Sequence, residues 1–341
     1  MENGIILDDE ARKQAIEEEK KRRRKNHIKR VAKDTIGGWL FVLPAVILMA
    51  VFTFYPIVMS FISAFMEHYE KGNITQNITI GFDNFRAVIL DDTGTTGMKF
   101  LTALDNTLFF AIVSVPISTL LALLIAVALN SIKAVQKAYQ TVLFLPYLTN
   151  ALSMGAVFAT FFDVIGTKKE REVLGTASYG LVNDIIRAFG GQWQMWLSTG
   201  NPWGNRLVVV IYSIWAGLPF KILILFSALQ NVNKQYYDAA KIDGASKNTT
   251  LWRITVPLIS PMLSYLLVTG MMGGLKVYSS IIGIFGQDMN SGEMGTMVGY
   301  VYDCINLQQT GYAAAGSLIL FGIIMIFTAI NMYVSKKKVH Y

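Results

Sequence analysis

The sequence predicts an all-α polytopic membrane protein with six transmembrane helices and both termini in the cytoplasm. Three observations carry this prediction. Of the 341 residues, 53% are hydrophobic and only 16% are charged. The apolar residues gather in windows long enough to cross a bilayer, and the basic residues gather on one side of those windows. A soluble enzyme would carry its apolar residues in short periodic segments, so that class is excluded.

Residues 1–36 form a charged segment with 11 Lys or Arg and 8 Asp or Glu, including an unbroken basic run at 20–25. The apolar stretch that follows is longer than the core of a cleavable signal peptide. We therefore expect a charged cytoplasmic N-terminal tail. Basic residues beside apolar spans report membrane orientation, which disfavours nucleic-acid binding.

Six apolar windows follow and define the expected transmembrane domain, residues 37–335. Several contain proline or paired glycine, which spanning helices tolerate when neighbouring helices satisfy the freed carbonyl groups. The windows are 39–65, 103–129, 139–162, 207–229, 258–284 and 312–334. Residues 336–341 form a short basic cytoplasmic tail.

The distribution of basic residues sets the orientation. With the N-terminus inside, the inner connecting segments hold 20 Lys or Arg and the outer ones hold 7. Since positive charge is retained on the cytoplasmic side, both termini are expected there. In an outer segment, 181–189 places its apolar residues on one helical face and predicts a helix lying on the membrane surface.

The cytoplasmic connection 230–257 is far longer than a turn between two spans requires. Asp238 favours a helix start, the Ala-Ala pair after it sustains the helix, and Gly244 permits a sharp bend. Pro257 lies where the next membrane helix begins, a position that tolerates a missing N–H. We predict a short helix, a bend and a second short helix. An ordinary amphipathic connector has the same composition and remains an alternative.

Residues for chemistry are scarce. The sequence has no glycine-rich loop ending in Lys-Ser or Lys-Thr that would hold nucleotide phosphates. Its three histidines are not spaced for metal binding or for a catalytic triad, and Cys304 is the only cysteine. We expect no catalytic, cofactor-binding or metal-ligating residue.

The cytoplasmic connection resembles the Glu-Ala-Ala loop of membrane subunits of binding-protein-dependent ABC importers. That pattern is Glu-Ala-Ala, three residues, Gly, nine residues and Ile-x-Leu-Pro. Every spacing fits, with Asp238 in place of Glu and Val256 in place of Leu.

Further segments resemble the carbohydrate branch of these importers, the maltose-type permeases. The resemblance covers roughly residues 36–335 and leaves the N-terminal tail outside. The segments are 81–85, 106–108, 180–183, 215–220, 228–230, 242–245 and 311–314.

The resemblance implies a permease that forms half of a pore in the bacterial cell membrane and imports a sugar or oligosaccharide. The expected partners are a second homologous permease, two ATPase subunits, an extracytoplasmic solute-binding protein and membrane lipid, with no nucleic acid. This chain is then a non-catalytic transport subunit, and ATP and Mg are bound by the ATPase subunits.

The family's motifs also imply site residues. A coupling helix that docks on the ATPase would include Asp238, Ala239, Ala240, Gly244, Ile254 and Pro257. A substrate path at the membrane midplane would include Gly217, Phe220, Thr269, Met272, Gly273 and Lys276.

Two lysines within the windows leave alternatives open. Lys276 departs from the amide expected at its position, which allows an acidic sugar, a glycerol-phosphate-like solute, or a contact with the partner permease. Lys221 is expected to snorkel or pair. An ion-coupled secondary transporter is a less favoured alternative, because it would need midplane acids and repeated halves. A membrane-embedded enzyme would need acidic pairs or histidines near an interface.

Overall fold

The computed structural model describes residues 2–67, 79–90, 98–132, 141–162, 179–198, 200–286 and 293–338. The start of the third window (139–140) and the end of the C-terminal tail (339–341) lie outside the described residues. The chain divides into an N-terminal unit, Met1–Ile62, and a main unit, Ser63–Tyr341.

The N-terminal unit is helical, with α1 (Glu2–Met49), a π-helical turn η1 (Ala50–Phe54) and the start of α2 (Tyr55–Phe65). The π turn ends at Phe54, two positions before Pro56. A proline in a helix lacks an N–H and its ring collides with the carbonyl four residues earlier, so a wider turn relieves both defects. The helix therefore continues through the proline.

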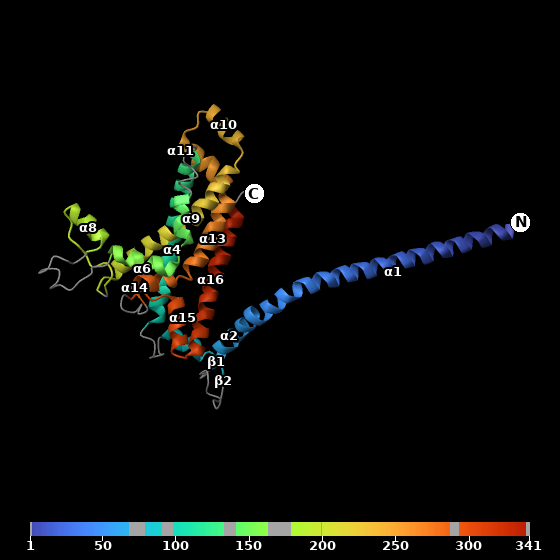
Figure 1. The fold of residues 1–341 in the computed structure, drawn as a ribbon, viewed down its shortest axis with the longest axis horizontal. Helices are drawn as coiled ribbons and strands as arrows, with labels where there is room; N and C mark the ends of the chain where they lie inside the picture. Colours follow the sequence, from blue (N-terminus) through green and yellow to red (C-terminus); the bar gives the residue numbers. More distant parts are fainter. Residues whose placement is uncertain are drawn as a thin grey trace. The chain divides into compact units, whose positions relative to one another are not determined.

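The main unit is also almost wholly helical (Figure 1). Its helices are α3 (Asp83–Leu90), α4 (Phe100–Ser131), η2 (Leu145–Leu148), α6 (Ala151–Phe162), α8 (Leu181–Ala188), α9 (Pro202–Gln230), α10 (Lys234–Ile242), α11 (Lys247–Thr250), η3 (Leu251–Thr255), α12 (Val256–Leu258), α13 (Ser260–Gly274), α14 (Ser279–Phe285), α15 (Met297–Asn306) and α16 (Thr310–Lys338). Within the described residues, the sole strands are β1 (Met66–Glu67) and β2 (Thr79–Ile80), which pair antiparallel. This agrees with the all-α class.

Four helical segments are long and apolar enough to cross a membrane: Gly38–Phe65, Phe100–Ser131, Pro202–Gln230 and Thr310–Ser335. Two sharply bent pairs raise the number to six if each pair is one span. These pairs are Thr141–Leu148 with Ala151–Phe162, bent by 108°, and Lys247–Leu258 with Ser260–Gly274, bent by 70°. The structure thus has four to six candidate spans.

Two predicted windows differ from the helices observed. The third window breaks at Thr149, whose backbone is extended, and α6 restarts where the Asn150 carboxamide oxygen accepts a hydrogen bond from the Leu152 N–H at 2.8 Å. The fifth window, 258–284, is wrong as a single helix, because α13 ends at Gly274 and α14 is a separate helix packed on α6. Hydropathy missed this break because the residues on both sides of it are apolar.

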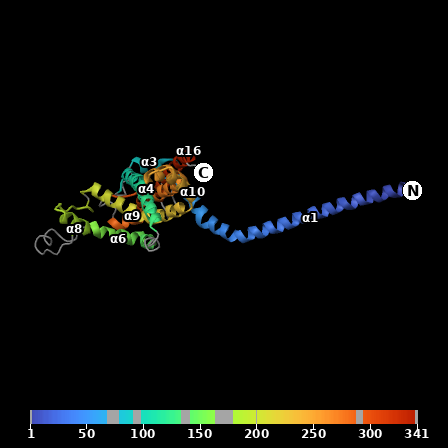
Figure 2. The ribbon, with the colours of Figure 1, turned by 90° about the horizontal axis from the view of Figure 1, so that it is seen from above.

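Helix α4 is the centre of the main unit and packs against both α9 and α13. Small residues recur about every four positions along its buried face, which lets neighbouring backbones approach closely. They are Ala103, Thr107, Ala111, Ser118, Ala122 and Ala126. Figures 1 and 2 show α6 and α8 on the side of this unit opposite α16.

Two of the segments that resemble maltose-type permeases, 81–85 and 311–314, contact each other at one end of the main unit. The buried Asn84 side chain donates hydrogen bonds to the carbonyl oxygens of Ala64, at 3.1 Å, and Met66, at 2.8 Å. A methyl group added to Gly311 would lie 2.9 Å from the Asn84 amide nitrogen. Gly311 therefore leaves the space that this asparagine occupies.

Helices α6 and α14 meet through a pair of glycines. A Cβ added to Gly155 would lie 2.9 Å from the Gly283 Cα atom, and one added to Gly283 would lie 2.9 Å from the Gly155 Cα atom. The Gly283 position also faces the Leu152 carbonyl oxygen. Because these neighbours are backbone atoms, they cannot move aside as a side chain could.

We predict that Gly283→Ala lowers the free energy of unfolding by about 1–3 kcal/mol, because the two helices must separate to admit the methyl group. Gly322→Ala on α16 is the matched control, since no atom lies within 4 Å of its added Cβ. The apparent melting temperatures of the purified proteins in detergent measure both effects. Equal melting temperatures for the two variants would contradict the glycine contact.

Candidate functional site

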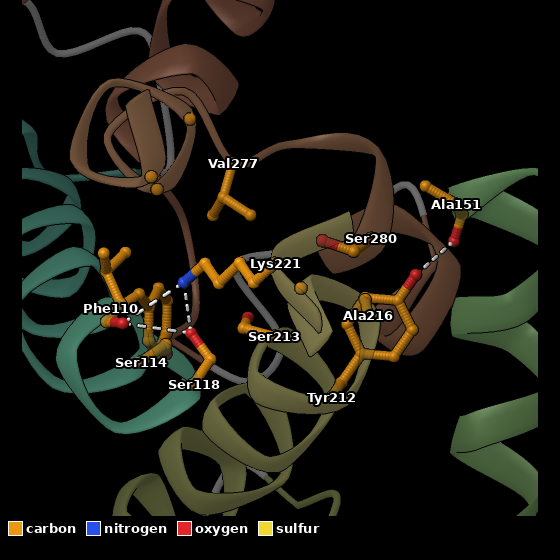
Figure 3. A pocket seen from close by; sticks show the side chains of 15 residues that line it. Phe110, Ser114, Ser118, Ala151, Tyr212, Ser213, Ala216, Lys221, Val277 and Ser280 are labelled. Atoms are coloured by element: carbon orange, nitrogen blue, oxygen red, sulfur yellow. Dashed lines mark hydrogen bonds between the residues drawn. The ribbon is translucent and has the colours of Figure 1, made fainter. Parts of the chain in front are cut away.

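A cavity of about 310 Å³ lies among α4, α9 and α13, beside the first residue of α6 and the start of α14 (Figure 3). Its lining combines serines, glycines, two aromatic side chains and one lysine. The lining residues are Phe110, Ser114, Val115, Ser118, Ala151, Tyr212, Ser213, Ala216, Gly217, Lys221, Gly270, Gly273, Gly274, Val277 and Ser280.

Glycines on α13 bring this helix close to α4 at the cavity. A Cβ added to Gly274 would lie 3.0 Å from the Ala111 Cα atom, and one added to Gly270 would lie 2.8 Å from a Val115 methyl carbon. The same Gly270 Cβ would lie 3.6 Å from the Lys221 ammonium nitrogen. The glycines thus permit close packing and leave the lysine uncovered by a side chain from α13.

Lys221 extends from α9 toward α4 in the wall of the cavity, and only 7% of its surface is exposed (Figure 3). Its ammonium group donates hydrogen bonds to the Val115 carbonyl oxygen, at 3.2 Å, and to the Ser118 hydroxyl. The Ser118 hydroxyl in turn donates to the Val115 carbonyl at 3.1 Å. Of the two alternatives that the sequence left open for Lys221, snorkelling and pairing, the structure shows the second, because the side chain turns into the protein and hydrogen-bonds to α4.

Two other buried hydroxyls of the lining, on Ser114 and Ser213, have no hydrogen-bond partner among the described residues. The Tyr212 hydroxyl instead donates to the Ala151 carbonyl at 3.0 Å. Because burying an unsatisfied hydroxyl costs free energy, the two serines favour a polar occupant of the cavity.

The structure brings together only part of the substrate path that the resemblance implied. Gly217 and Gly273 line the cavity, whereas Phe220, Thr269, Met272 and Lys276 are not among its lining residues. The Phe220 ring stacks on Tyr147 with 5.8 Å between centroids, and Lys276 lies exposed just beyond the end of α13. Thr269 donates to the Tyr265 carbonyl within its own helix, and Met272 is half-buried.

The sequence analysis did not single out the serines of this cavity and left the role of Lys221 open. A signal was present, because Ser114 and Ser118 are four residues apart on α4, as Gly217 and Lys221 are on α9. Residues at that spacing share one face of a helix. Nothing in the sequence shows that the two faces meet.

The loop at 230–257 contains the predicted short helix, bend and second short helix, but the first helix begins earlier than expected. Helix α10 starts at Lys234 after Asn233, whose side-chain oxygen accepts from the Gln235 N–H at 3.0 Å. The prediction of a start at Asp238 is wrong because this asparagine caps the helix first. Asp238 instead pairs with Lys241 at 3.4 Å across one turn.

The bend after α10 depends on the backbone of Gly244, whose φ is +67°. The Ala245 N–H donates to the Ala240 carbonyl at 2.9 Å, and the Gly244 N–H donates to the Lys241 carbonyl at 3.1 Å. These two bonds form a Schellman motif, which requires a left-handed residue after the helix. No atom lies within 4 Å of an added Cβ, so glycine is needed for its backbone angle and not for space.

The second half of the loop runs through α11, η3 and α12 and contains Ile254 and Pro257. Here too a π-helical turn, Leu251–Thr255, ends two positions before a proline, Pro257. The buried Thr255 hydroxyl lies 3.4 Å from the Tyr237 hydroxyl of α10, which joins the two halves of the loop. Ala239 lies inside α10, and Ala240 is buried.

This arrangement defines a class of protein: a polytopic helical membrane protein with a polar cavity between its helices and a structured loop between two of its apolar segments. In the described part of the chain, no cluster of His, Cys, Asp or Glu is placed to hold a metal ion. Residues 98–340 match the family described as binding-protein-dependent transport system inner membrane component. The chain belongs to this family and is a permease subunit.

Curated relatives are similar over most of their length. The arabinooligosaccharides transport system permease protein AraP of Bacillus subtilis is 28% identical over 300 residues, which cover 87% of this chain and 88% of that protein. The sn-glycerol-3-phosphate transport system permease protein UgpA of Agrobacterium fabrum is 29% identical over 310 residues, covering 89% and 96%.

A solved structure shows the same fold. It is the crystal structure of a bacterial alginate ABC transporter in complex with an alginate pentasaccharide-bound periplasmic protein. One of its chains aligns with a TM-score of 0.72 at 21% identity, covering 91% of this chain and 99% of that one.

We predict that Ser213→Ala leaves the melting temperature unchanged or slightly raised, because the lost hydroxyl has no hydrogen-bond partner in the described structure. Thr107→Val is the contrasting variant. The Thr107 hydroxyl donates to the Ala103 carbonyl at 2.7 Å and accepts from the Met297 N–H at 2.9 Å. Its loss should destabilise the protein by about 1–3 kcal/mol. Thermal unfolding of both variants in detergent checks this, and a Ser213→Ala loss as large as that of Thr107→Val would contradict it.

Proposed function

We propose that this permease forms half of the translocation path for a sugar or oligosaccharide in an ATP-driven importer, and that the cavity between α4, α9 and α13 is part of that path. The single observation that carries the proposal is the chemistry of the cavity lining. Buried serine hydroxyls without a hydrogen-bond partner among the described residues suit the hydroxyl groups of a saccharide, and the rings of Phe110 and Tyr212 suit its C–H faces.

The names of the relatives support a saccharide cargo. They include permeases for arabinooligosaccharides, for multiple sugars and for trehalose and maltose. A secondary transporter is less well supported, because no acidic side chain lines the cavity in the described part of the chain.

The proposed assembly contains a second permease of the same family, two ATPase subunits that bind ATP and Mg, and an extracytoplasmic binding protein. The aligned transporter structure holds a periplasmic protein with its saccharide, which supports this assembly. We place the chain in the bacterial cell membrane with six spans and both termini inside, as the 20 to 7 division of basic residues favours.

The loop formed by α10, α11, η3 and α12 is proposed to dock on an ATPase subunit. Its surface carries large apolar side chains that a partner would bury: Ile242 is 87% exposed, and Tyr236 and Trp252 are about half exposed. Exposed apolar groups clustered on a polar loop mark protein contacts. Asp238, Ala239, Ala240, Gly244, Ile254 and Pro257 shape this loop and are proposed as coupling residues.

Reconstitution tests the proposal. We predict that proteoliposomes containing the complete importer and its loaded binding protein accumulate labelled saccharide only when ATP is supplied. The permease chain alone is expected to hydrolyse no ATP. Saccharide accumulation driven by an ion gradient without ATP, or ATP turnover by the isolated chain, would contradict the proposal.

Gly244 offers a matched pair of variants for the coupling loop. We predict that Gly244→Val impairs coupling, because a β-branched residue at φ +67° is strained by roughly 1–3 kcal/mol. Gly244→Asn should retain most activity, because asparagine tolerates the left-handed region. Co-purification of the ATPase, stimulated ATP turnover and saccharide uptake report the effect. Wild-type values for Gly244→Val in all three assays would make the loop an ordinary connector.

A further inference from the structure

Lys221 is a buried cation whose contacts in the described structure are all with neutral groups. Its ammonium donates to the Val115 carbonyl and to the Ser118 hydroxyl. No acidic side chain is among the described residues that line the cavity. An ammonium has three N–H donors, so two contacts leave one donor available.

A buried cation without a counter-ion is expensive in a membrane protein. Hydrogen bonds to a carbonyl and a hydroxyl recover part of the lost hydration but supply no negative charge. Lysines inside membrane segments accordingly face cavities, partners or transported solutes. Here the lysine faces a cavity, and an anionic group of a ligand in that cavity would supply the negative charge that the described lining residues lack.

The space beside the ammonium is open because two neighbouring positions are glycine. A Cβ added to Gly270 would lie 3.6 Å from the Lys221 nitrogen, and one added to Gly217 would lie 3.9 Å from its Cε atom. Side chains at these positions would cover the cation. Their absence leaves the third N–H donor free to meet a ligand in the cavity.

We propose that Lys221 binds the carboxylate of an acidic oligosaccharide on the translocation path. This rests on the proposed function and names the substrate class for the same cavity. The single ammonium matches a group of single negative charge, and the unpartnered hydroxyls of Ser114 and Ser213 are placed to bind sugar hydroxyls beside it. Lys276 lies exposed outside this lining, so the assignment of an acidic substrate moves from Lys276 to Lys221.

The test compares uptake by the complete importer in proteoliposomes. The probes are labelled uronic-acid trisaccharides of several linkages, each paired with its carboxyl-reduced neutral counterpart. The variants are Lys221→Met, which keeps the volume and removes the charge, and Lys221→Arg, which keeps the charge. Lys99→Met, at an exposed lysine before α4, controls for loss of a positive charge elsewhere.

We expect the wild-type importer to take up at least one acidic probe about tenfold faster than its neutral counterpart, as one charge-assisted hydrogen bond provides. Lys221→Met should lose about that factor for the acidic probe only. Lys221→Arg and Lys99→Met should keep the preference. Co-purification with the partner subunits identifies variants that fail to assemble, in which case Lys221→Gln replaces Lys221→Met.

Three results would overturn the proposal. If the wild type took up only neutral probes, its substrate would not be an acidic oligosaccharide, but the proposed function would stand. Equal loss of acidic and neutral uptake in Lys221→Met would assign the lysine to a contact with the second permease or to the fold. An unchanged preference in Lys221→Met would place selectivity elsewhere. If the complete importer took up no saccharide in the presence of ATP, the proposed function itself would be overturned instead.

Discussion

The packing of small residues along α4 against α9 and α13 is the constraint on which the main unit depends. Lipid offers no hydrophobic drive between helices, so their association rests on close contact and hydrogen bonds. Helix α4 supplies the contact with alanine, serine and threonine on its buried face. Asn106 adds hydrogen bonds, donating to the carbonyls of Glu293 and Gly295 and accepting from Arg206 of α9 at 2.9 Å.

The same small residues explain why a cavity lies at this junction. Where serine and glycine face one another, the helices approach closely and yet their side chains do not fill the remaining space. Lys221 spans this space and binds the Val115 carbonyl, which also accepts from Ser118 and Thr119. The proposed site for a polar solute is thus lined by residues that also pack the helices, at the cost of a charge held away from water.

The sequence was sufficient to predict an all-α protein with several apolar spans and the helix, bend and helix of the loop at 230–257, because hydropathy and local turn chemistry determine both. The left-handed Gly244 and the helix on each side of it follow from residues within one loop. The break after Gly274 and the cavity could not be predicted, because they depend on which helix faces meet. The contact between Asn84 and Gly311 could not be predicted for the same reason, because it joins segments more than two hundred residues apart.

The most direct measurement of the central claim is a structure of the complete importer trapped with its saccharide in the membrane. We predict that the saccharide contacts Ser114 and Ser213 and that its carboxylate lies within hydrogen-bond distance of the Lys221 ammonium, between α4, α9 and α13. A saccharide lying against Phe220 and Lys276, with the cavity filled by side chains of the second permease, would contradict the account.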